Sequence, residues 1–142
     1  MDGATSARRE APANDTPAYN PGARFDLVVS DVELRRNAAG RMLMERIYQP
    51  KGKGPFPAVL DLHGGAWTRK DRLAEEPMDR ALASSGLLVV AIDLTLASEA
   101  PYPACVQDAN HAVRWLKANA ARWNGDVSRL GVYGSSSGGH VA

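Results

Sequence analysis

The sequence RLGVYGSSSGGHVA, at Arg129–Ala142, decides the fold class of this chain. Its apolar run, Leu130–Tyr133, is typical of a strand buried on both faces of a sheet. The run leads directly into a Gly-x-Ser-x-Gly pattern centred on Ser136 and followed by small residues that can open a helix. This order predicts a sharp strand-to-helix turn that presents Ser136 as a nucleophile. Gly134 and Gly138 are then expected to lack side chains because the chain crosses itself closely there.

The same segment has a plainer interpretation as a glycine-serine turn or an anion-binding loop. A Gly-Ser-Ser-Ser-Gly-Gly stretch before a helix can bind a phosphate through its backbone amides. The segment lacks the lysine of a P-loop, and neither Gly131 nor Gly134 begins a dinucleotide-binding Gly-x-Gly-x-x-Gly pattern. Its position directly after an apolar strand favours the serine nucleophile.

Upstream, two more short apolar runs alternate with helical stretches. Ala58–Leu62 and Leu87–Ile92 predict strands buried on both faces. Leu73–Ser85 lies between them, has a helical composition, and is followed by Gly86, a common helix stop. Before the last strand, apolar residues at helical spacing predict a second helix, namely Val106, Ala109, Val113, Leu116 and Ala120. The alternation predicts a parallel sheet with right-handed crossovers and helices on both faces.

The segment before these units predicts an antiparallel hairpin at the edge of the sheet. Apolar and polar residues alternate from Phe25 onward, and Asn37–Gly40 then resembles a turn. Leu43–Tyr48 is again strand-like, so the two segments are expected to pair. Pro50–Pro57 contains three prolines and two glycines, and is expected to break regular structure.

Composition bounds the class of protein. With 142 residues, 44% of them hydrophobic and 23% charged, the chain has room for one globular domain. Residues 1–22 have few large apolar side chains and predict a disordered tail, which leaves 25–142 as the domain. Seventeen Lys and Arg against sixteen Asp and Glu give a net charge of +1, with no long run of like charge. We therefore expect no nucleic-acid partner.

Cysteine use and hydropathy point to a cytoplasmic protein. Cys105 is the only cysteine, so no disulfide can form within the chain and a shielded thiol is expected. No apolar stretch approaches the roughly 18 residues of a membrane span, and no signal-peptide pattern follows Met1. We expect no membrane contact.

A second motif, His63-Gly64-Gly65-Ala66-Trp67, follows the first buried strand. The tripeptide His-Gly-Gly alone is compatible with a simple strand-ending turn. Its place upstream of the Ser136 pattern, with strand-helix units between, favours an oxyanion loop instead. Amides of Gly64, Gly65 or Ala66 would then join the amide of Ser137 in stabilising the negative oxygen of a tetrahedral intermediate. Further roles are expected of two flanking side chains: His63 braces the loop, and Trp67 lines the substrate pocket or packs on the loop.

With both motifs in place, the chain resembles the HGG-containing esterases and lipases of the α/β-hydrolase fold, in the hormone-sensitive-lipase-like and feruloyl-esterase-like (BD-FAE-like) groups. The phrases that carry the resemblance are FPAVLDLHGGAW at 56–67, EAPYPACVQDANHAVRWLKANA at 99–120, and RLGVYGSSSGGHVA at 129–142. It implies the amino-terminal half of that fold: an antiparallel edge hairpin, then parallel strands with helices on both faces, in a three-layer sandwich that stops after the nucleophile turn.

The resemblance also implies an activity. It is hydrolysis of a small-molecule carboxylic ester through an acyl-enzyme on Ser136, with no cofactor and no metal. A serine peptidase or amidase of the same fold remains an alternative, as does a non-catalytic remnant or interaction module. Asp108 matches an acidic family position that we interpret as structural. Leu94 and Thr95 stand after Asp93 where the family often has Tyr-Arg, which leaves the subgroup and the contacts of that loop open.

The resemblance assigns no general base within this chain. In the family, the acid and the histidine of the triad come after the nucleophile, and only two residues follow His140. His111 is expected in a surface or core role, and His140 outside the triad. We therefore expect the 142-residue chain to be inactive alone, as a partial sequence, a frameshifted remnant, or one half that pairs with a separate carboxyl-terminal half.

Overall fold

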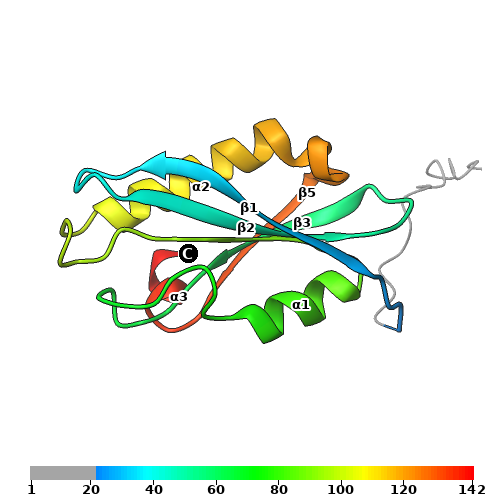
Figure 1. Ribbon diagram of the computed structural model, residues 1–142, viewed down its shortest axis with the longest axis horizontal. Coiled ribbons are helices and arrows are strands. Elements are labelled where there is room, and N and C mark those ends of the chain that lie inside the picture. The colour runs from blue at the N-terminus through cyan, green and yellow to red at the C-terminus, as the bar shows by residue number, and fades with distance from the viewer. Residues whose placement is uncertain (1–21) are drawn as a thin grey trace, which may run out of the picture.

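The computed structural model describes residues 22–142, so the expected tail at 1–22 lies, except for Gly22, outside the described residues. These residues form a five-stranded sheet in the order β1-β2-β4-β3-β5, with helices packed against it (Figure 1). The strands are β1 (Leu27–Arg36), β2 (Met42–Pro50), β3 (Phe56–Leu62), β4 (Leu88–Ile92) and β5 (Gly125–Gly134). The helices are α1 (Glu76–Ser84), α2 (Ala104–Asn119), the 3-10 helix η1 (Ala120–Trp123) and α3 (Ser137–Val141).

The predicted edge hairpin is confirmed. β1 pairs antiparallel with β2 and lies at one edge of the sheet. The turn between them closes with a hydrogen bond of 2.9 Å from the Gly40 amide to the Asn37 carbonyl, and Gly40 has a φ of 83°. A positive φ of this size favours glycine. β2 also pairs antiparallel with β4, which joins the hairpin to the rest of the sheet.

The predicted parallel strands are also present. β3 lies between β4 and β5 and pairs parallel with both, so that Leu60 is opposite Val90 on one side and Val132 on the other. The connection from β3 to β4 carries α1, and the connection from β4 to β5 carries α2. Because β3 and β5 are parallel neighbours, their carboxyl ends meet at the same edge, with Leu62 paired to Gly134.

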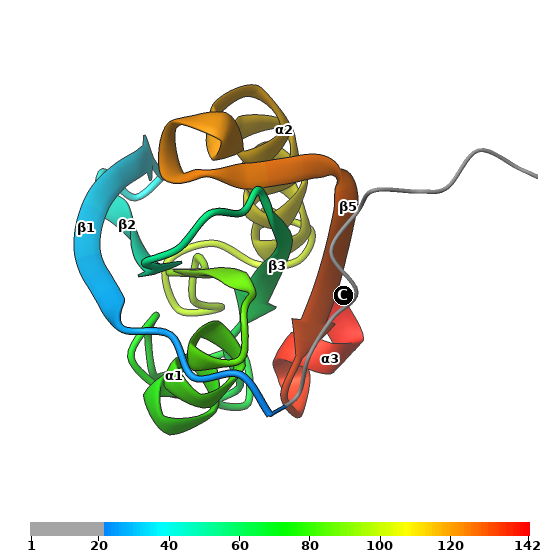
Figure 2. The same ribbon diagram turned by 90° about the vertical axis from the view of Figure 1, so that its right-hand side faces the viewer.

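The two faces of the sheet are covered by different helices, α2 on one side and α1 on the other (Figure 2). Side chains alternate along a strand, so adjacent residues enter different cores. Val90 belongs to the core that includes Leu116 of α2, whereas Val89 belongs to the smaller core that includes Ala83 of α1. The three-layer arrangement expected from the sequence is therefore confirmed.

Two local expectations were wrong. α1 begins at Glu76 rather than Leu73, because the Asp71 carboxylate accepts a hydrogen bond of 2.8 Å from the Leu73 amide and holds a turn there. Proline suits the first turn of a helix, and Pro77 occupies that turn. The last strand is not buried on both faces: Val132 is 42% exposed, because β5 is an edge strand that pairs only with β3 within residues 22–142. Across those residues, no helix is long and apolar enough to cross a membrane.

Candidate active site

The turn around Ser136, which we call the serine turn (residues 134–138), connects β5 to α3. Ser136 is exposed and has a φ of 52° and a ψ of −118°. A serine with positive φ is strained, and such strain persists only where the surrounding structure holds it. The Ser135 amide donates to the Leu62 carbonyl over 3.3 Å, and the Gly138 amide donates to the Ser135 carbonyl over 2.8 Å. The turn is therefore fixed to the end of β3.

The steric role predicted for the two glycines is confirmed. A Cβ atom on Gly134 would overlap the backbone of Gly138, and a Cβ atom on Gly138 would overlap the carbonyl oxygen of Leu62. No side chain fits at either position without moving backbone. The serine turn thus needs glycine on both sides of Ser136 to approach β3.

The segment after β3, the glycine loop (residues 63–67), has an unusual backbone. Gly65, Ala66 and Trp67 have φ values of 117°, 53° and 61°, three positive angles in succession. Two of these residues carry a Cβ atom, so the loop stores strain. It is held by hydrogen bonds from the Arg69 amide to the Gly65 carbonyl over 3.1 Å, and from the Ala97 amide to the Trp67 carbonyl over 2.7 Å.

The structure brings the glycine loop and the serine turn into contact. The Trp67 amide donates to the Ser137 hydroxyl over 3.3 Å. A Cβ atom placed on Gly64 would lie 2.9 Å from the Ser135 carbonyl oxygen and 3.4 Å from the Ser136 Cβ. Within residues 22–142, the amides of Gly64, Gly65 and Ala66 donate no hydrogen bond. Donors without partners beside Ser136 are available to an incoming oxygen.

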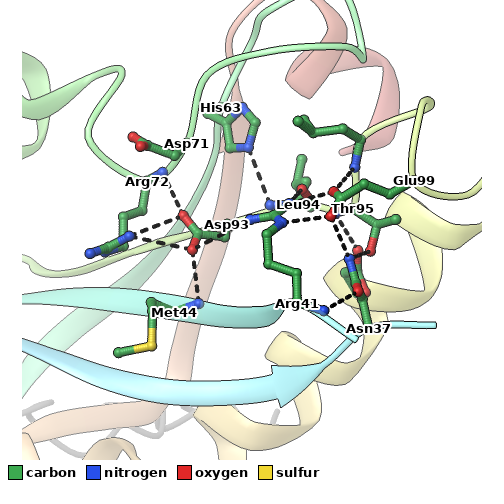
Figure 3. Close-up of polar contacts among 12 residues, drawn as sticks. Asn37, Arg41, Met44, His63, Asp71, Arg72, Asp93, Leu94, Thr95 and Glu99 are labelled. Atoms are coloured by element: carbon green, nitrogen blue, oxygen red, sulfur yellow. Dashed lines mark hydrogen bonds and ion pairs between the residues drawn. The ribbon is translucent and has the colours of Figure 1, made fainter. Parts of the chain in front are cut away.

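His63 braces the glycine loop, as expected. Its Nε2 accepts a hydrogen bond of 3.2 Å from the Leu94 amide (Figure 3). Its Nδ1 lies 2.6 Å from the Gly64 carbonyl oxygen, so the proton is on Nδ1, which donates. The ring is 4% exposed and both of its nitrogens are engaged. In this arrangement His63 has no nitrogen left to act on Ser136.

The other two histidines lie on helices, and neither ring has a hydrogen bond to the Ser136 hydroxyl within residues 22–142. His111 lies on α2, and His140 on α3 packs its ring edge-on against Trp67, with ring centroids 5.6 Å apart and planes at 86°. Among the described residues, none of the three histidines has a hydrogen bond to the Ser136 hydroxyl. The predictions that His111 has a surface or core role and that His140 lies outside the triad stay predictions.

A buried carboxylate, Asp93, lies directly after β4 and next to Leu94, whose amide binds His63 (Figure 3). Asp93 is 3% exposed and accepts hydrogen bonds from the backbone amides of Met44, at 2.9 Å, and Arg72, at 3.0 Å. The Arg72 guanidinium adds an ion pair of 3.3 Å. Asp93 thus connects β2 with the segment that precedes α1.

A second ion pair, which the sequence did not reveal, lies nearby. The Arg41 guanidinium donates two hydrogen bonds of 2.7 Å to the Glu99 carboxylate and one of 2.9 Å to the Leu94 carbonyl. The hydrogen bonds from the Arg41 side chain lower the pKa of Glu99 to about 2. Asn37 donates to Glu99 as well, over 3.3 Å. The partners are 58 or more residues apart, so no local pattern could have identified them.

Leu94 and Thr95, which follow Asp93 where the family often has Tyr-Arg, both hold the β4–α2 loop in place. Leu94 binds His63 through its amide, and the Thr95 amide donates to the Asp108 carboxylate over 2.7 Å. Asp108 is 2% exposed and also lies 3.8 Å from the Arg35 guanidinium. These contacts agree with the structural role expected for Asp108, since it ties the β4–α2 loop to α2.

A pocket of about 360 Å³ opens beside the glycine loop. Its lining is mostly apolar and comes from Ala66, Trp67, Thr68, Thr95, Ala97, Ala100, Tyr102, Cys105 and His140. Trp67 is 49% exposed, so it both lines this pocket and packs against α3. Trp67 thus lines a pocket and packs against the helix that follows Ser136, and its role in binding substrate stays a prediction.

Known proteins match most of this chain. A family model described as BD-FAE matches residues 46–142. Carboxylesterase NlhH of Mycobacterium tuberculosis is 39% identical over 99 residues, which are 68% of this chain and 31% of that protein. Esterase LipI of the same species is 36% identical over 115 residues, 78% of this chain and 36% of that protein. The chain thus spans about a third of the length of these curated relatives.

Solved structures agree with the sequence comparison. The esterase of the archaeon Pyrobaculum calidifontis is 33% identical with a TM-score of 0.73, covering 81% of this chain and 37% of that one. EstE1, a thermostable carboxylesterase from a metagenomic library, is 31% identical with a TM-score of 0.74, covering 84% of this chain and 41% of that one. The described sheet and helices are the amino-terminal part of an α/β-hydrolase fold, and the chain belongs to the BD-FAE family.

Proposed function

We propose that this chain carries the nucleophile and the oxyanion hole of a serine hydrolase that acts on small-molecule carboxylic esters. The observation that supports the proposal is the contact between the serine turn and the glycine loop. It places an exposed, strained Ser136 beside amides that have no partner within residues 22–142. The carboxylesterase relatives support the choice of an ester as substrate.

The proposed reaction begins when the Ser136 oxygen bonds to the ester carbonyl carbon and gives its proton to a general base. The carbonyl oxygen becomes negatively charged, and amides of Gly64, Gly65 or Ala66, with that of Ser137, donate hydrogen bonds to it. These interactions strengthen only as charge develops, which is what lowers the barrier. Collapse of the intermediate expels the alcohol and leaves an acyl group on Ser136, which water then removes.

We infer that the base and its carboxylate partner come from outside these 142 residues. His63 uses both ring nitrogens in bracing, and His140 packs on Trp67. A serine hydroxyl is a poor nucleophile without a base in hydrogen-bond reach. The 142-residue chain alone is therefore expected to be inactive, and the pocket beside Ala66 and Trp67 is expected to receive part of the ester.

The first test is labelling of the chain with a fluorophosphonate probe, with Ser136→Ala and Ser135→Ala as variants. Slow labelling or none is expected from the folded chain. Labelling at the rate of a complete esterase, lost in Ser136→Ala and kept in Ser135→Ala, would show that the base lies within the chain. That result would overturn the inference about the base and leave Ser136 as the nucleophile.

A complementation test addresses the activity itself. Residues 22–142 would be fused to the part of the Mycobacterium tuberculosis carboxylesterase that follows its matching segment. We expect the fusion to hydrolyse a nitrophenyl ester but not a peptide anilide, and Ser136→Ala to abolish the turnover while Ser135→Ala retains it. A fusion that folds by circular dichroism but has no esterase activity, or keeps it in Ser136→Ala, would contradict the proposal.

A further inference from the structure

Two buried carboxylates and a partly buried tyrosine lie together on the α1 face of the sheet, next in sequence to residues that build the candidate active site. Asp61 of β3 is 1% exposed and Asp79 of α1 is fully buried. Tyr133 of β5 donates a hydrogen bond from its hydroxyl to the Asp79 carboxylate. Asp61 and Tyr133 are register partners on neighbouring parallel strands, so Asp79 approaches both from the helix. We call these three residues the acid cluster.

Among residues 22–142, no cationic side chain forms an ion pair with the acid cluster. Within residues 22–142, neither aspartate takes part in an ion pair, and one oxygen of each, Oδ1 of Asp61 and Oδ2 of Asp79, has no hydrogen-bond partner. The other titratable groups that act on the cluster are Glu75 and Glu76 at the start of α1 and Tyr48 on β2. Arg46 and Arg80 pair with Glu76 instead.

Two neighbouring carboxylates in a buried site are not both ionised, because burial disfavours each charge and the two charges repel each other. Asp79 already accepts the Tyr133 hydroxyl, so it is the better acceptor of the two. Asp61 is then the partner that keeps a proton and donates it to Asp79. In agreement, burial raises the pKa of both aspartates, and the Asp79 carboxylate raises that of Asp61 further.

The acid cluster is connected to both halves of the candidate site. Asp61 lies next to Leu62, whose carbonyl accepts the Ser135 amide and contacts Gly138. Tyr133 lies next to Gly134, the first residue of the serine turn. Asp79 belongs to α1, the first helix after the glycine loop. A change in how α1 docks on β3 and β5 would therefore be transmitted to the serine turn and to the glycine loop.

We propose that Asp61 and Asp79 hold one proton between them and, with Tyr133, form a positioning cluster that fixes α1 under the strands carrying the glycine loop and Ser136. The importance of this cluster for catalysis rests on the proposed esterase function. Its effect on the geometry of the serine turn does not depend on that function.

The proposal makes local opening depend on pH. Opening of α1 lets Asp61 release its proton to water at the ordinary aspartate pKa, whereas the closed state holds it more tightly. The equilibrium constant for opening α1 therefore rises by up to about tenfold per pH unit, as the pH increases from the ordinary aspartate pKa toward the raised pKa of Asp61. In Asp61→Asn the side chain donates to Asp79 at every pH, so the contribution of Asp61 to this dependence disappears.

The test is hydrogen exchange of the 142-residue chain between pH 5 and pH 8, corrected for intrinsic rates. We expect the protection of α1, residues 63–67 and residues 134–138 to fall with pH more steeply in the wild type than in Asp61→Asn, which retains only the pH dependence of the other groups. Asp61→Ala, which lacks the donor, is expected to lose protection there at every pH. Glu33→Gln, which alters an exposed carboxylate on β1, serves as the matched control.

Each other outcome overturns a part of the proposal. Equal pH dependence in the wild type and Asp61→Asn would exclude the shared proton. If the wild type and Asp61→Asn differ equally in the β1–β2 hairpin, the cluster affects only global stability and does not position α1. If Asp61→Ala and Asp61→Asn show equal protection, the hydrogen bond donated by residue 61 does not matter. Carbon NMR of the aspartate carboxyl groups in the wild-type chain needs no variant, and we expect one aspartate to titrate well above the rest. If the exchange results are as expected but Ser136 shows no labelling and no turnover in the tests above, the proposed esterase function is rejected and the positioning role of the cluster is kept.

Discussion

Gly138 illustrates how a single missing methyl group permits the serine turn. Its Cα lies so close to the Leu62 carbonyl that a Cβ atom would overlap the oxygen. Backbone atoms of β3 cannot move aside as the end of a flexible side chain can. Gly131, seven residues earlier on β5, has the opposite environment, since a Cβ atom added there would have no neighbouring atom within 4 Å. The two glycines therefore form a matched pair.

The first prediction concerns this pair. Gly138→Ala is expected to destabilise the chain by about 2 to 3 kcal/mol, since the overlap forces the turn away from β3. Gly131→Ala is expected to change stability by less than about 0.5 kcal/mol, as is usual at an open surface position. Urea unfolding followed by circular dichroism measures both. Equal effects of the two substitutions would show that the turn does not depend on this close approach.

Glu45 is a second residue whose surroundings matter, because its burial changes its pKa. Its side chain is completely buried and, within residues 22–142, neither carboxylate oxygen has a hydrogen bond. Burial raises its pKa to about 8. Because the folded pKa is above the unfolded value of roughly 4.3, the protonated form favours the folded state. That contribution is complete below the unfolded pKa and is lost as the pH rises to the folded pKa.

The second prediction follows from the raised pKa of Glu45. Relative to Glu45→Gln, the wild-type chain is expected to lose up to about 1.4 kcal/mol of stability per pH unit between about pH 5 and pH 8. Urea unfolding at several pH values gives the two curves. Glu33→Gln on exposed β1 should run parallel to the wild type. Parallel curves for Glu45→Gln and the wild type would mean that Glu45 is hydrated in solution.

At the scale of elements, the Arg41–Glu99 pair holds the β1–β2 turn against the β4–α2 loop. Arg41 follows the turn, and its guanidinium meets Glu99 in a two-pronged contact with both distances at 2.7 Å. Such geometry suits arginine and is lost with lysine. Since the same guanidinium also binds the Leu94 carbonyl, the hairpin supports the loop that holds His63.

The third prediction uses the lowered pKa of Glu99. The pair is partly exposed, so Glu99→Gln is expected to cost only about 1 kcal/mol at pH 7. A carboxylate whose folded pKa is lowered to about 2 stabilises the fold above its unfolded pKa and loses that effect as the pH falls toward 2. The wild type and Glu99→Gln should therefore converge between about pH 4.5 and pH 2 in urea unfolding. Arg41→Lys should retain part of the stability. A constant difference across that range would rule out the ionic contact as its cause.

Periodicity predicted most of these elements, and long-range contacts account for what it missed. The hairpin follows from alternation of apolar and polar residues, β3 and β4 from short apolar runs, and α2 from helical spacing. The serine turn and the glycine loop, which come from two separate motifs, lie in contact. The start of α1 depended on one side-chain contact at Asp71, and the exposure of β5 depends on its place in the sheet. The Arg41–Glu99 pair and the acid cluster join residues distant in sequence, which no local pattern records.

At the scale of the whole molecule, the two edges of the sheet differ. β1 presents charged residues such as Asp31 and Glu33, and its register shifts between Glu33 and Arg35. Charges and irregularities of this kind discourage edge-to-edge pairing. β5 is the other edge, and it leaves Val127 46% and Val132 42% exposed. The β5 side is therefore the expected site of self-association.

The fourth prediction tests that difference. The 142-residue chain is expected to associate as its concentration rises, and Val132→Lys is expected to reduce the association by placing a charge on the exposed face of β5. Val28→Lys, at a similarly exposed valine on β1, should have little effect. Sedimentation velocity over a range of concentrations measures each. A chain that stays monomeric, or responds equally to both substitutions, would contradict the prediction.

The strand order also determines at which stage of folding the candidate active site can form. β3 and β5 are neighbours in the sheet, yet β4 and α2 separate them along the chain. Pairing over such a separation requires closing a long loop, which is slow compared with forming a hairpin or a helix. The glycine loop is synthesised early but has no serine beside it until β5 docks. We therefore expect a nascent or partly folded chain to expose no activated serine, so that reactivity arises only with the completed sheet.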